Sequence, residues 1–232
     1  MTVSKKDQVR SMFNKIAWRY DLLNHLLSLN IDKIWRKKLV KMLSAKQPKS
    51  ILDVATGTGD LAIIAARIKP TEIIGIDIAD EMLQIGRKKV AARGFQSMIS
   101  LQTADSENLP FPAERFEATM VAFGVRNFEN LDLGLAEMFR VLKKNGTIYV
   151  LEFSIPTNKL FRPFYFFYFK NILPLIGKMV SKDTDAYTYL PDSVSAFPSG
   201  RSFIERLEKT GFTNCTIRSL TFGIATIYTG EK

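Results

Sequence analysis

Short runs of β-prone apolar residues alternate along this chain with segments in which apolar residues recur every three or four positions. The runs predict seven strands, at residues 51–54, 72–77, 97–102, 116–123, 146–153, 215–220 and 224–229. The helical spacing predicts helices between most of them, at residues 61–67, 79–90, 131–142 and 202–209. Such alternation indicates an α/β fold, with a mostly parallel seven-stranded sheet, helices on both faces, and ligands at the carboxyl ends of the strands.

The residues before the first strand predict a pair of helices. Apolar residues from Val9 to Leu27 have helical spacing and predict one helix, with a break near Asp21. A second helix is expected from about Asp32, a suitable N-cap, and Pro48 closes this part. Because no repeat or linker separates these helices from the rest, we expect them to cover the mouth of a single domain.

The stretch from Ile51 to Asp60, ILDVATGTGD, predicts a strand, a glycine turn and the start of a helix. Gly57 and Gly59 lack the Cβ atoms that would hold a ligand away from the backbone. The helix directs its unpaired N–H groups and positive dipole end toward the same place. We therefore expect a polar small molecule here; the alternative is a strand, turn and helix with no ligand.

Acidic residues around the turn narrow the choice of ligand. The turn alone also fits the permissive dinucleotide fingerprint G-x-G-x-x-A, which leaves NAD open. Asp53 lies just before the turn, and Asp77 ends the next strand, where a carboxylate can bind both ribose hydroxyls of a nucleoside. Pyrophosphate avoids nearby anions, whereas the ammonium and sulfonium groups of S-adenosylmethionine are attracted by Asp53 or Asp60. The charge of these residues therefore favours S-adenosylmethionine, a methyl donor, over NAD as the ligand.

Two further positions point to the adenine end of such a ligand. Met82, in the helix after the second strand, is expected beside the ring. Asp105, in the loop after the third strand, could accept a hydrogen bond from the exocyclic amine. The alternative for Asp105 is a solvated loop carboxylate.

The composition of the chain indicates its domain size, its expected location in the cell and the charge of its partner. The chain has 232 residues, of which 46% are hydrophobic, enough for one domain with a substantial core. Its one cysteine, Cys215, cannot form an internal disulfide, and the first ten residues lack the apolar core of a signal peptide, so we expect a cytoplasmic protein. A net charge of +10 favours an anionic partner, either lipid or nucleic acid.

Residues 160–180 hold the most unusual composition, with six consecutive aromatics from Phe164 to Phe169. Basic residues and prolines interrupt the run well short of a membrane span. Three interpretations stay open: a tunnel for an isoprenoid tail, an interfacial helix resting on lipid, or core and dimer packing. Residues 183–198 are interpreted as a polar loop over the ligand, with Tyr187, Tyr189 and Ser195 as candidate contacts.

Longer motifs resemble one enzyme family over nearly the whole length. They are Tyr20 to Asn24 with Ser28 and Trp35, the glycine turn, Leu109 to Pro112, Phe123 to Asn127, and Arg140 to Lys143 leading to Gly146, Glu152 and Ser154. The chain resembles the demethylmenaquinone and ubiquinone C-methyltransferases, class I enzymes that use S-adenosylmethionine. It departs from their usual pattern at Leu23, Asp32, Ala55, Ala122 and Lys144-Asn145.

The resemblance implies a Rossmann-like class I methyltransferase that methylates a prenylated quinol, most simply demethylmenaquinol. It implies donor contacts at Thr58, at Asp77 on the ribose, and at Asp105 with Ser106 around the adenine. The domain would divide into an N-terminal cover (1–47), a cofactor-binding core (48–155), an acceptor-binding insertion (156–200) and a closing helix with two strands (201–232). A benzoquinol acceptor is the alternative.

Candidate catalytic residues lie on the acceptor side. Arg126 and Asn127, just beyond the fourth strand, are placed to hold an oxyanion on the acceptor; for Arg126 the alternative is a structural ion pair. Tyr20, Asp21 and His25 form a polar cluster that could relay the acceptor's proton. For His25 the alternative is a satisfied histidine on a helix face. With one histidine and one cysteine, we expect no metal site.

Two rival functions differ in class from this one. An RNA-binding methyltransferase would use the positive charge, but the aromatic run is not interleaved with basic residues, so we expect no nucleic-acid partner. An NAD-dependent oxidoreductase would instead be stabilised by nicotinamide. The expected partners are a prenylated quinol and, through peripheral contact, the inner face of a membrane. The sequence leaves open whether a second copy forms a homodimer with it.

Overall fold

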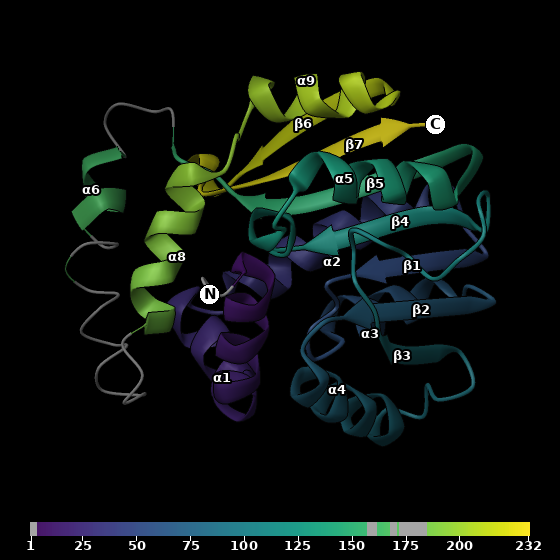
Figure 1. Ribbon diagram of the computed structural model, residues 1–232, viewed down its shortest axis with the longest axis horizontal. Coiled ribbons are helices and arrows are strands. Elements are labelled where there is room, and N and C mark those ends of the chain that lie inside the picture. Colours follow the sequence, from purple (N-terminus) through teal and green to yellow (C-terminus); the bar gives the residue numbers. More distant parts are fainter. Residues whose placement is uncertain (1–3, 157–161, 168–170, 172–184) are drawn as a thin grey trace.

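The computed structural model describes residues 4–156, 162–167, 171 and 185–232 (Figure 1). Its centre is one seven-stranded sheet with the order β3-β2-β1-β4-β5-β7-β6. The strands are β1 Ser50–Val54, β2 Glu72–Asp77, β3 Ile99–Thr103, β4 Phe116–Ala122, β5 Leu142–Phe153, β6 Thr213–Leu220 and β7 Ala225–Glu231. The predicted seven-stranded α/β fold is confirmed.

The first five strands are mutually parallel. Asp53 of β1 lies between Gly75 of β2 and Met120 of β4 in register, so the carboxyl ends of these strands meet at one edge of the sheet. The last strand pair turns back: β7 is antiparallel to both β5 and β6. The edge where the parallel strands end is therefore the place for a ligand.

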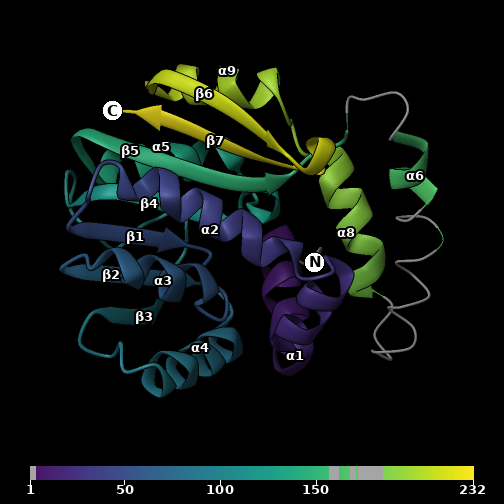
Figure 2. The same ribbon diagram turned by 180° about the vertical axis from the view of Figure 1, so that it is seen from behind.

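Helices cover both faces of the sheet (Figures 1 and 2). The α-helices are α1 Lys5–Leu27, α2 Ile31–Ser44, α3 Asp60–Ala65, α4 Asp80–Ala92, α5 Leu131–Val141, α6 Arg162–Phe167, α8 Asp185–Ala196 and α9 Arg201–Thr210. Short 3-10 helices are η1 Ala66–Ile68, η2 Val125–Asn127 and η4 Thr221–Gly223. Apolar residues of α2, α3 and α4 form one core cluster, and those of α5 and α9 form the other.

Strand β1 shows why a continuous apolar run forms the centre of this sheet. All five of its residues are buried. Successive side chains point to opposite faces, so Ile51 joins the α2, α3 and α4 cluster while Leu52 joins the α5 and α9 cluster. Each strand residue contributes to one of two cores, which fixes the register of the sheet.

Three helices lie beyond the carboxyl ends of the parallel strands. Figures 1 and 2 show α1 and α8 directly outside this edge, with α6 farther out. Helix α1 contacts α4, and α8 contacts η2, which follows β4. Of the two helices expected to cover the mouth of the domain, α1 lies at the ligand edge, whereas α2 packs into the core against α3 and β5.

Several local predictions are wrong. Helix α1 is continuous through Asp21, where a break was expected. Asp32 is not an N-cap: Asn30 takes that place in the left-handed conformation, and Asp32 is buried inside α2. Strand β5 begins at Leu142 rather than at residue 146. Residues 185–196 form helix α8, with Pro191 inside it, instead of the expected loop.

The aromatic run falls largely outside the described residues. Of residues 160–180, the structure describes 162–167 and 171, so the tunnel and interfacial interpretations, which concern the whole segment, stay predictions. In the part of the chain that the structure describes, no helix has both the length and the apolar character needed to cross a bilayer.

Candidate functional site

The glycine turn forms a backbone cradle at the end of β1. Ala55, Gly57 and Gly59 all have positive φ angles, of 51°, 57° and 79°, so the chain folds back tightly before α3. A Cβ on Gly57 would lie 3.4 Å from Cε of Met82, at the wall of the cavity described below. Gly59 is the N-cap of α3 and packs toward Leu101 rather than toward the cavity.

Asp77 ties the end of β2 to this turn. One carboxylate oxygen accepts the Gly57 N–H at 2.8 Å and the other accepts the Ala79 N–H at 2.9 Å. Burial raises the pKa of Asp77, which the backbone hydrogen bonds partly oppose. Each oxygen keeps lone pairs for further donors, as two ribose hydroxyls require.

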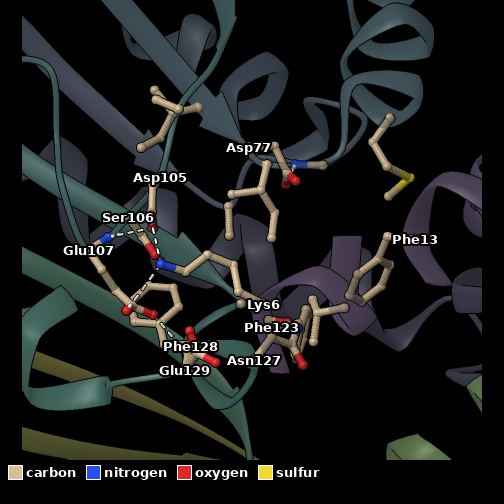
Figure 3. A pocket seen from close by; sticks show the side chains of 18 of the residues that line it. Lys6, Phe13, Asp77, Asp105, Ser106, Glu107, Phe123, Asn127, Phe128 and Glu129 are labelled. Carbon is tan, nitrogen blue, oxygen red and sulfur yellow. Dashed lines mark hydrogen bonds and ion pairs between the residues drawn. The ribbon is translucent and has the colours of Figure 1, made fainter. Parts of the chain in front are cut away.

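A cavity lies between the cradle and helix α1 (Figure 3). Five predicted cofactor contacts line it, and so do Tyr20 and Asn127; the five are Gly57, Asp77, Met82, Asp105 and Ser106. Its free volume is about 70 Å³, well below the roughly 300–1,000 Å³ of small-molecule sites. A nucleoside-sized ligand therefore fits only when the cover moves away from the cradle.

Lysine side chains of α1 hold the cover closed. Figure 3 shows Lys6 reaching across the cavity, where its Nζ lies 2.6 Å from Asp105 and 3.4 Å from Glu107. The hydrogen bond to Asp105 raises the pKa of Lys6. Lys5 donates to the carbonyl of Phe128 at 2.6 Å. The sequence analysis missed Lys6, which occupies the carboxylate expected to bind the adenine amine.

Asp53 is placed beneath the cradle rather than in the main cavity. Its exposure is 1%, and it lines a small second cavity with Tyr20 and Arg36. One oxygen accepts the Thr56 hydroxyl at 2.6 Å, while Oδ1 makes no hydrogen bond to any described residue. Burial raises the pKa of Asp53 to about 7. A buried acceptor without a donor fits a ligand that brings an ammonium group to this turn.

Thr58 and Asp21 latch α1 onto the turn. The Thr58 hydroxyl donates to Asp21 at 2.6 Å, and Lys89 lies 2.8 Å from the same carboxylate and also pairs with Asp60. Thr58 lines the small cavity beside Asp53, and Asp21 lines neither cavity. The expected donor contact of Thr58 and the expected proton relay through Asp21 both involve groups already engaged in holding the cover.

His25 links the two N-terminal helices. Its Nδ1 lies 3.0 Å from Asp32, which also accepts the Ser28 hydroxyl at 2.6 Å and pairs with Arg36. Burial alone would raise the pKa of Asp32, but the Ser28 hydrogen bond and the charges of Arg36 and His25 hold it below the ordinary value. His25 lines neither the main nor the small cavity, an arrangement that matches the alternative of a satisfied histidine.

Arg126 forms a buried ion pair beside the cavity. Its guanidinium lies 2.7 Å from Glu152 and donates to the Phe123 carbonyl at 2.5 Å. Its side chain is 7% exposed, and Nε is buried without a hydrogen-bond partner among the described residues. Burial raises the pKa of Glu152, which the Arg126 charge opposes. The ion-pair alternative for Arg126 is thus present, with one N–H still free to donate.

Three tyrosines face the charge of Arg126. Burial raises the pKa of Tyr20, Tyr165 and Tyr189, and in each case the Arg126 charge acts in the opposite direction. The Tyr189 hydroxyl donates to Asn127 Oδ1 at 3.0 Å, which joins α8 to η2. Tyr189 and Arg126 line a larger cavity of about 740 Å³. Asn127 lines the cavity of the cradle, and Phe128 and Glu129 line both cavities.

Solved structures share the fold. A SAM-dependent methyltransferase from Thermotoga maritima superposes with a TM-score of 0.66 over 96% of this chain and 99% of that one, at 17% identity. Phosphoethanolamine N-methyltransferase 2 of Haemonchus contortus, solved with S-adenosyl-L-methionine, gives 0.68 over 100% of this chain and 60% of that one, at 11% identity. The fold is that of the class I methyltransferases.

The model of the ubiE/COQ5 methyltransferase family matches residues 1–232. A demethylmenaquinone methyltransferase of Bacteroides fragilis is 45% identical over 229 residues, or 98% of this chain and 94% of that protein. A ubiquinone/menaquinone biosynthesis C-methyltransferase UbiE of Geobacter sulfurreducens is 46% identical, over 98% and 90%. This chain belongs to the ubiE/COQ5 methyltransferase family, which confirms the predicted resemblance, the enzyme class and S-adenosylmethionine as cofactor.

Proposed function

We propose that this enzyme methylates a ring carbon of a prenylated quinol, converting demethylmenaquinol to menaquinol. The names of its relatives support a quinol acceptor in menaquinone or ubiquinone biosynthesis. The observation in the structure that carries the proposal is the Arg126 charge, which lines the larger cavity and acts on three tyrosine phenols, one of which, Tyr20, lines the cofactor cavity.

A hydroquinone is itself a phenol, so it experiences the same charge as these tyrosines. The field of Arg126 favours the phenolate over the phenol, which raises the electron density on the ring carbon beside the oxygen. The unpartnered Nε–H of Arg126 can donate to that oxygen, and the Asn127 amide can add a second hydrogen bond. Loss of one hydroxyl proton makes the ring nucleophilic, and loss of the ring proton after methylation restores aromaticity.

The larger cavity gives the acceptor a place. Its volume of about 740 Å³ suits a bicyclic ring with part of a tail. Asn127 lines the cofactor cavity and is hydrogen-bonded to Tyr189, which lines the larger one. We infer that the acceptor replaces the Tyr189 hydroxyl on Asn127, which opens the wall between the two cavities.

S-adenosylmethionine supplies an electrophilic methyl group when it is bound. We assign its ribose to Asp77, its adenine to Met82, Asp105 and Ser106, and its ammonium to Asp53. Gly57 gives the close backbone approach, while Gly59 and Thr58 act indirectly by shaping the turn and by holding Asp21. Tyr20 lines both cavities at the turn and experiences the Arg126 charge, so we place its phenol beside the donor, on the side of Arg126.

The roles of His25 and Asp21 are proposed with their observed partners in mind. Both hold α1 in place, so we propose that they act by closing the cover rather than by touching the acceptor. We also propose peripheral contact with the cytoplasmic face of a membrane, because a prenylated acceptor is dissolved in the bilayer.

The test is incubation with labelled S-adenosylmethionine and a set of reduced quinones, with mass measurement of the products. Methylation of a demethylnaphthoquinol is the expected result. Preference for a benzoquinol would favour the ubiquinone branch, which the printed name of the Geobacter relative includes. Absence of methyl transfer to any quinol, with the cofactor bound, would overturn the proposal.

A further inference from the structure

Five large apolar side chains of the N-terminal helices and a neighbouring turn are exposed to solvent. They are Trp18 (70% exposed), Leu22 (60%), Leu29 (73%), Ile34 (52%) and Phe222 (70%), and we call them the Trp18 surface. Single exposed apolar residues are ordinary, but a group of large ones at one end of a molecule marks an interaction site.

Helix α1 is apolar on two opposite sides. Val9, Phe13 and Tyr20 line the cofactor cavity. Trp18 and Leu22, four residues apart, lie on the other side of the helix, along the same outward stripe as Lys15. The inner side accounts for packing over the cofactor cavity and against α4, so the outer apolar side requires a different partner.

Two exposed members of the surface hold strained backbone. Leu29 has a φ of 51° and Phe222 a φ of 57°, a region that bulky side chains rarely adopt. The Leu29 side chain is 73% exposed, so burial does not offset the strain at that position. Strain maintained to present an apolar side chain outward indicates a role in binding.

The members lie at the ligand edge of the sheet. The Trp35 indole donates to Thr221 at 2.8 Å, which ties α2 to the turn that carries Phe222. Trp35 also packs against Phe153, the last residue of β5, at 6.1 Å between ring centroids. The turn that carries Phe222 therefore lies near the end of β5, at the ligand edge of the sheet, and helix α1, which carries Trp18 and Leu22, lies outside the same edge (Figure 2).

The charge around this surface is positive. Residues 10–41 hold eight lysines and arginines and two acids. Both acids face inward, since Asp21 is bonded to Thr58 and Asp32 is 2% exposed. The outward cations include Arg19, whose guanidinium lies 3.9 Å from the Trp18 ring centroid; the lysines among them are Lys15, Lys33, Lys37, Lys38 and Lys41. Aromatic and aliphatic side chains among cations suit the interface of an anionic bilayer.

We propose that the Trp18 surface is where this enzyme docks on an anionic lipid bilayer, with Trp18, Leu22 and Leu29 inserted at the headgroup boundary. The inference rests on the proposed function, in which the acceptor is dissolved in that bilayer. Docking through this end turns the cavities toward the lipid, so the acceptor ring reaches Asn127 without passing through water.

Tryptophan fluorescence tests the insertion directly. The chain has two tryptophans, and Trp35 is 2% exposed, so a change in emission on binding reports on Trp18. We expect a blue shift with vesicles of equal parts phosphatidylglycerol and phosphatidylcholine, quenching by brominated acyl chains, and no shift in Trp18→Phe. Affinity for pure phosphatidylcholine vesicles should be at least about tenfold weaker.

Leu29→Asn separates docking from folding. Asparagine accepts the left-handed backbone more readily than leucine, so the midpoint of thermal unfolding should rise by about 2–4 °C. Vesicle affinity should fall about tenfold, because the inserted side chain is lost. The matched control is Leu133→Ser, which removes another exposed leucine, 46% exposed, from α5 rather than from the Trp18 surface. It should bind vesicles as the wild type does.

Four outcomes would overturn the proposal: no vesicle binding, binding without a change in Trp18 emission, equal loss of affinity in Leu29→Asn and Leu133→Ser, or burial of Trp18 in a dimer without lipid. Light scattering detects the last case. A failure of the proposed function is distinguished from a failure of docking by a separate measurement. If the proposed function is wrong, a tail-less quinol in vesicle-free buffer is not methylated. The vesicle measurements do not depend on turnover, so they test docking alone. With that soluble quinol, Leu29→Asn should keep wild-type rates.

Discussion

The two walls of the cofactor cavity are formed by different parts of the chain, one mainly by backbone groups and the other by long side chains. The cradle wall, from β1 through the glycine turn to β2, offers backbone amides and one carboxylate fixed by them, as in the 2.8 Å bond between Gly57 and Asp77. The wall formed by α1 relies on long side chains, with Lys6 spanning the cavity to Asp105. The first is held by the sheet register, while the second depends on ion pairs that water and salt weaken.

This difference separates two tasks. A cradle set by the sheet can bind the cofactor with constant geometry, and a cover held by partly exposed ion pairs can open to admit it. The acceptor side stands between these two cases, because Arg126 is charged but largely buried, in an ion pair with the buried Glu152. Substitutions in the three regions should therefore change turnover, affinity and exchange rate separately.

The largest effect is expected at Arg126. Arg126→Ala should reduce turnover by about 10²–10³-fold, because a preorganised donor to the acceptor oxygen is lost. It should also destabilise the fold by about 3–5 kcal/mol, because Glu152 is left buried and unpaired. Initial rates at saturating acceptor, cofactor calorimetry and thermal unfolding measure the three quantities, and cofactor affinity should stay unchanged.

A double variant distinguishes catalysis from stability at this site. Arg126→Met with Glu152→Gln removes both charges, so most of the stability should return while turnover stays low. Wild-type turnover in the double variant would mean that Arg126 serves the fold alone.

The next effect is expected at the cradle. Asp77→Asn removes the charge that receives the ribose hydroxyls, at a loss of about 1.5–3 kcal/mol, so the Kd for S-adenosylhomocysteine should rise about 10–100-fold. Asp80→Asn is the control: its carboxylate is exposed in the first turn of α4 and bonded to Thr103, so affinity should be unchanged. Equal affinities in the two variants would place the ribose elsewhere.

The protonation state of Asp53 should change when the cofactor binds. Its pKa of about 7 means that the carboxyl group is partly protonated at neutral pH. A cationic ligand favours the carboxylate, so S-adenosylmethionine binding near pH 7 should release a fraction of a proton, and S-adenosylhomocysteine, without the sulfonium charge, should release less. Calorimetry in buffers of different ionisation enthalpy measures the release, and Asp53→Asn should show none.

The same group predicts a pH dependence of stability. The folded pKa lies above the ordinary 3.8, so the folded state binds the proton more tightly. The resulting stabilisation is complete at low pH and declines until pH exceeds about 7. Relative to Asp53→Asn, the wild type should therefore lose thermal stability between about pH 4 and pH 7. A constant difference between the two proteins across this range would contradict the assignment.

The smallest effect is expected at the cover. The Lys6 pair is about one-third exposed on each side, so Lys6→Met should change the free energy of closure by at most about 1 kcal/mol. Cofactor association should quicken by up to about fivefold and lose its acceleration by salt. Lys15→Met, an exposed lysine on the outward side of α1, is the control for general charge effects. Stopped-flow association that responds to salt equally in all three proteins would exclude Lys6 as a latch.

The cradle could be predicted from the sequence because its determinants are local. Asp53, the two glycines and Asp77 lie within one short strand, turn, helix and strand. At each of these positions the local backbone geometry favours the residue type that is present. The placement of Asp105 and Ser106 in the same cavity also follows from parallel strand order. The exact ends of strands were predicted less well: β5 begins at Leu142, whereas residue 146 was expected.

The cover could not be predicted because its contacts join distant parts of the chain. Lys6 meets Asp105 across 99 positions and Asp21 meets Thr58 across 37, and no local pattern encodes such pairs. The buried Asp32 was mistaken for a cap since a carboxylate near a helix start usually serves that role. Pro191 lacks the N–H that a helix interior uses, which made α8 resemble a loop although Tyr189 anchors it to Asn127.

The positions of the two chain ends bear on how this protein is handled. The amide of Lys5 donates to Glu129, a residue of the cofactor cavity wall, so any fusion joined ahead of α1 emerges beside the entrance. Lys232 lies at the opposite edge of the sheet, where its ammonium donates to the Leu142 carbonyl at 2.7 Å (Figure 1). Affinity handles and fluorescent reporters belong after Lys232, where they leave both the entrance and the lipid-facing end clear.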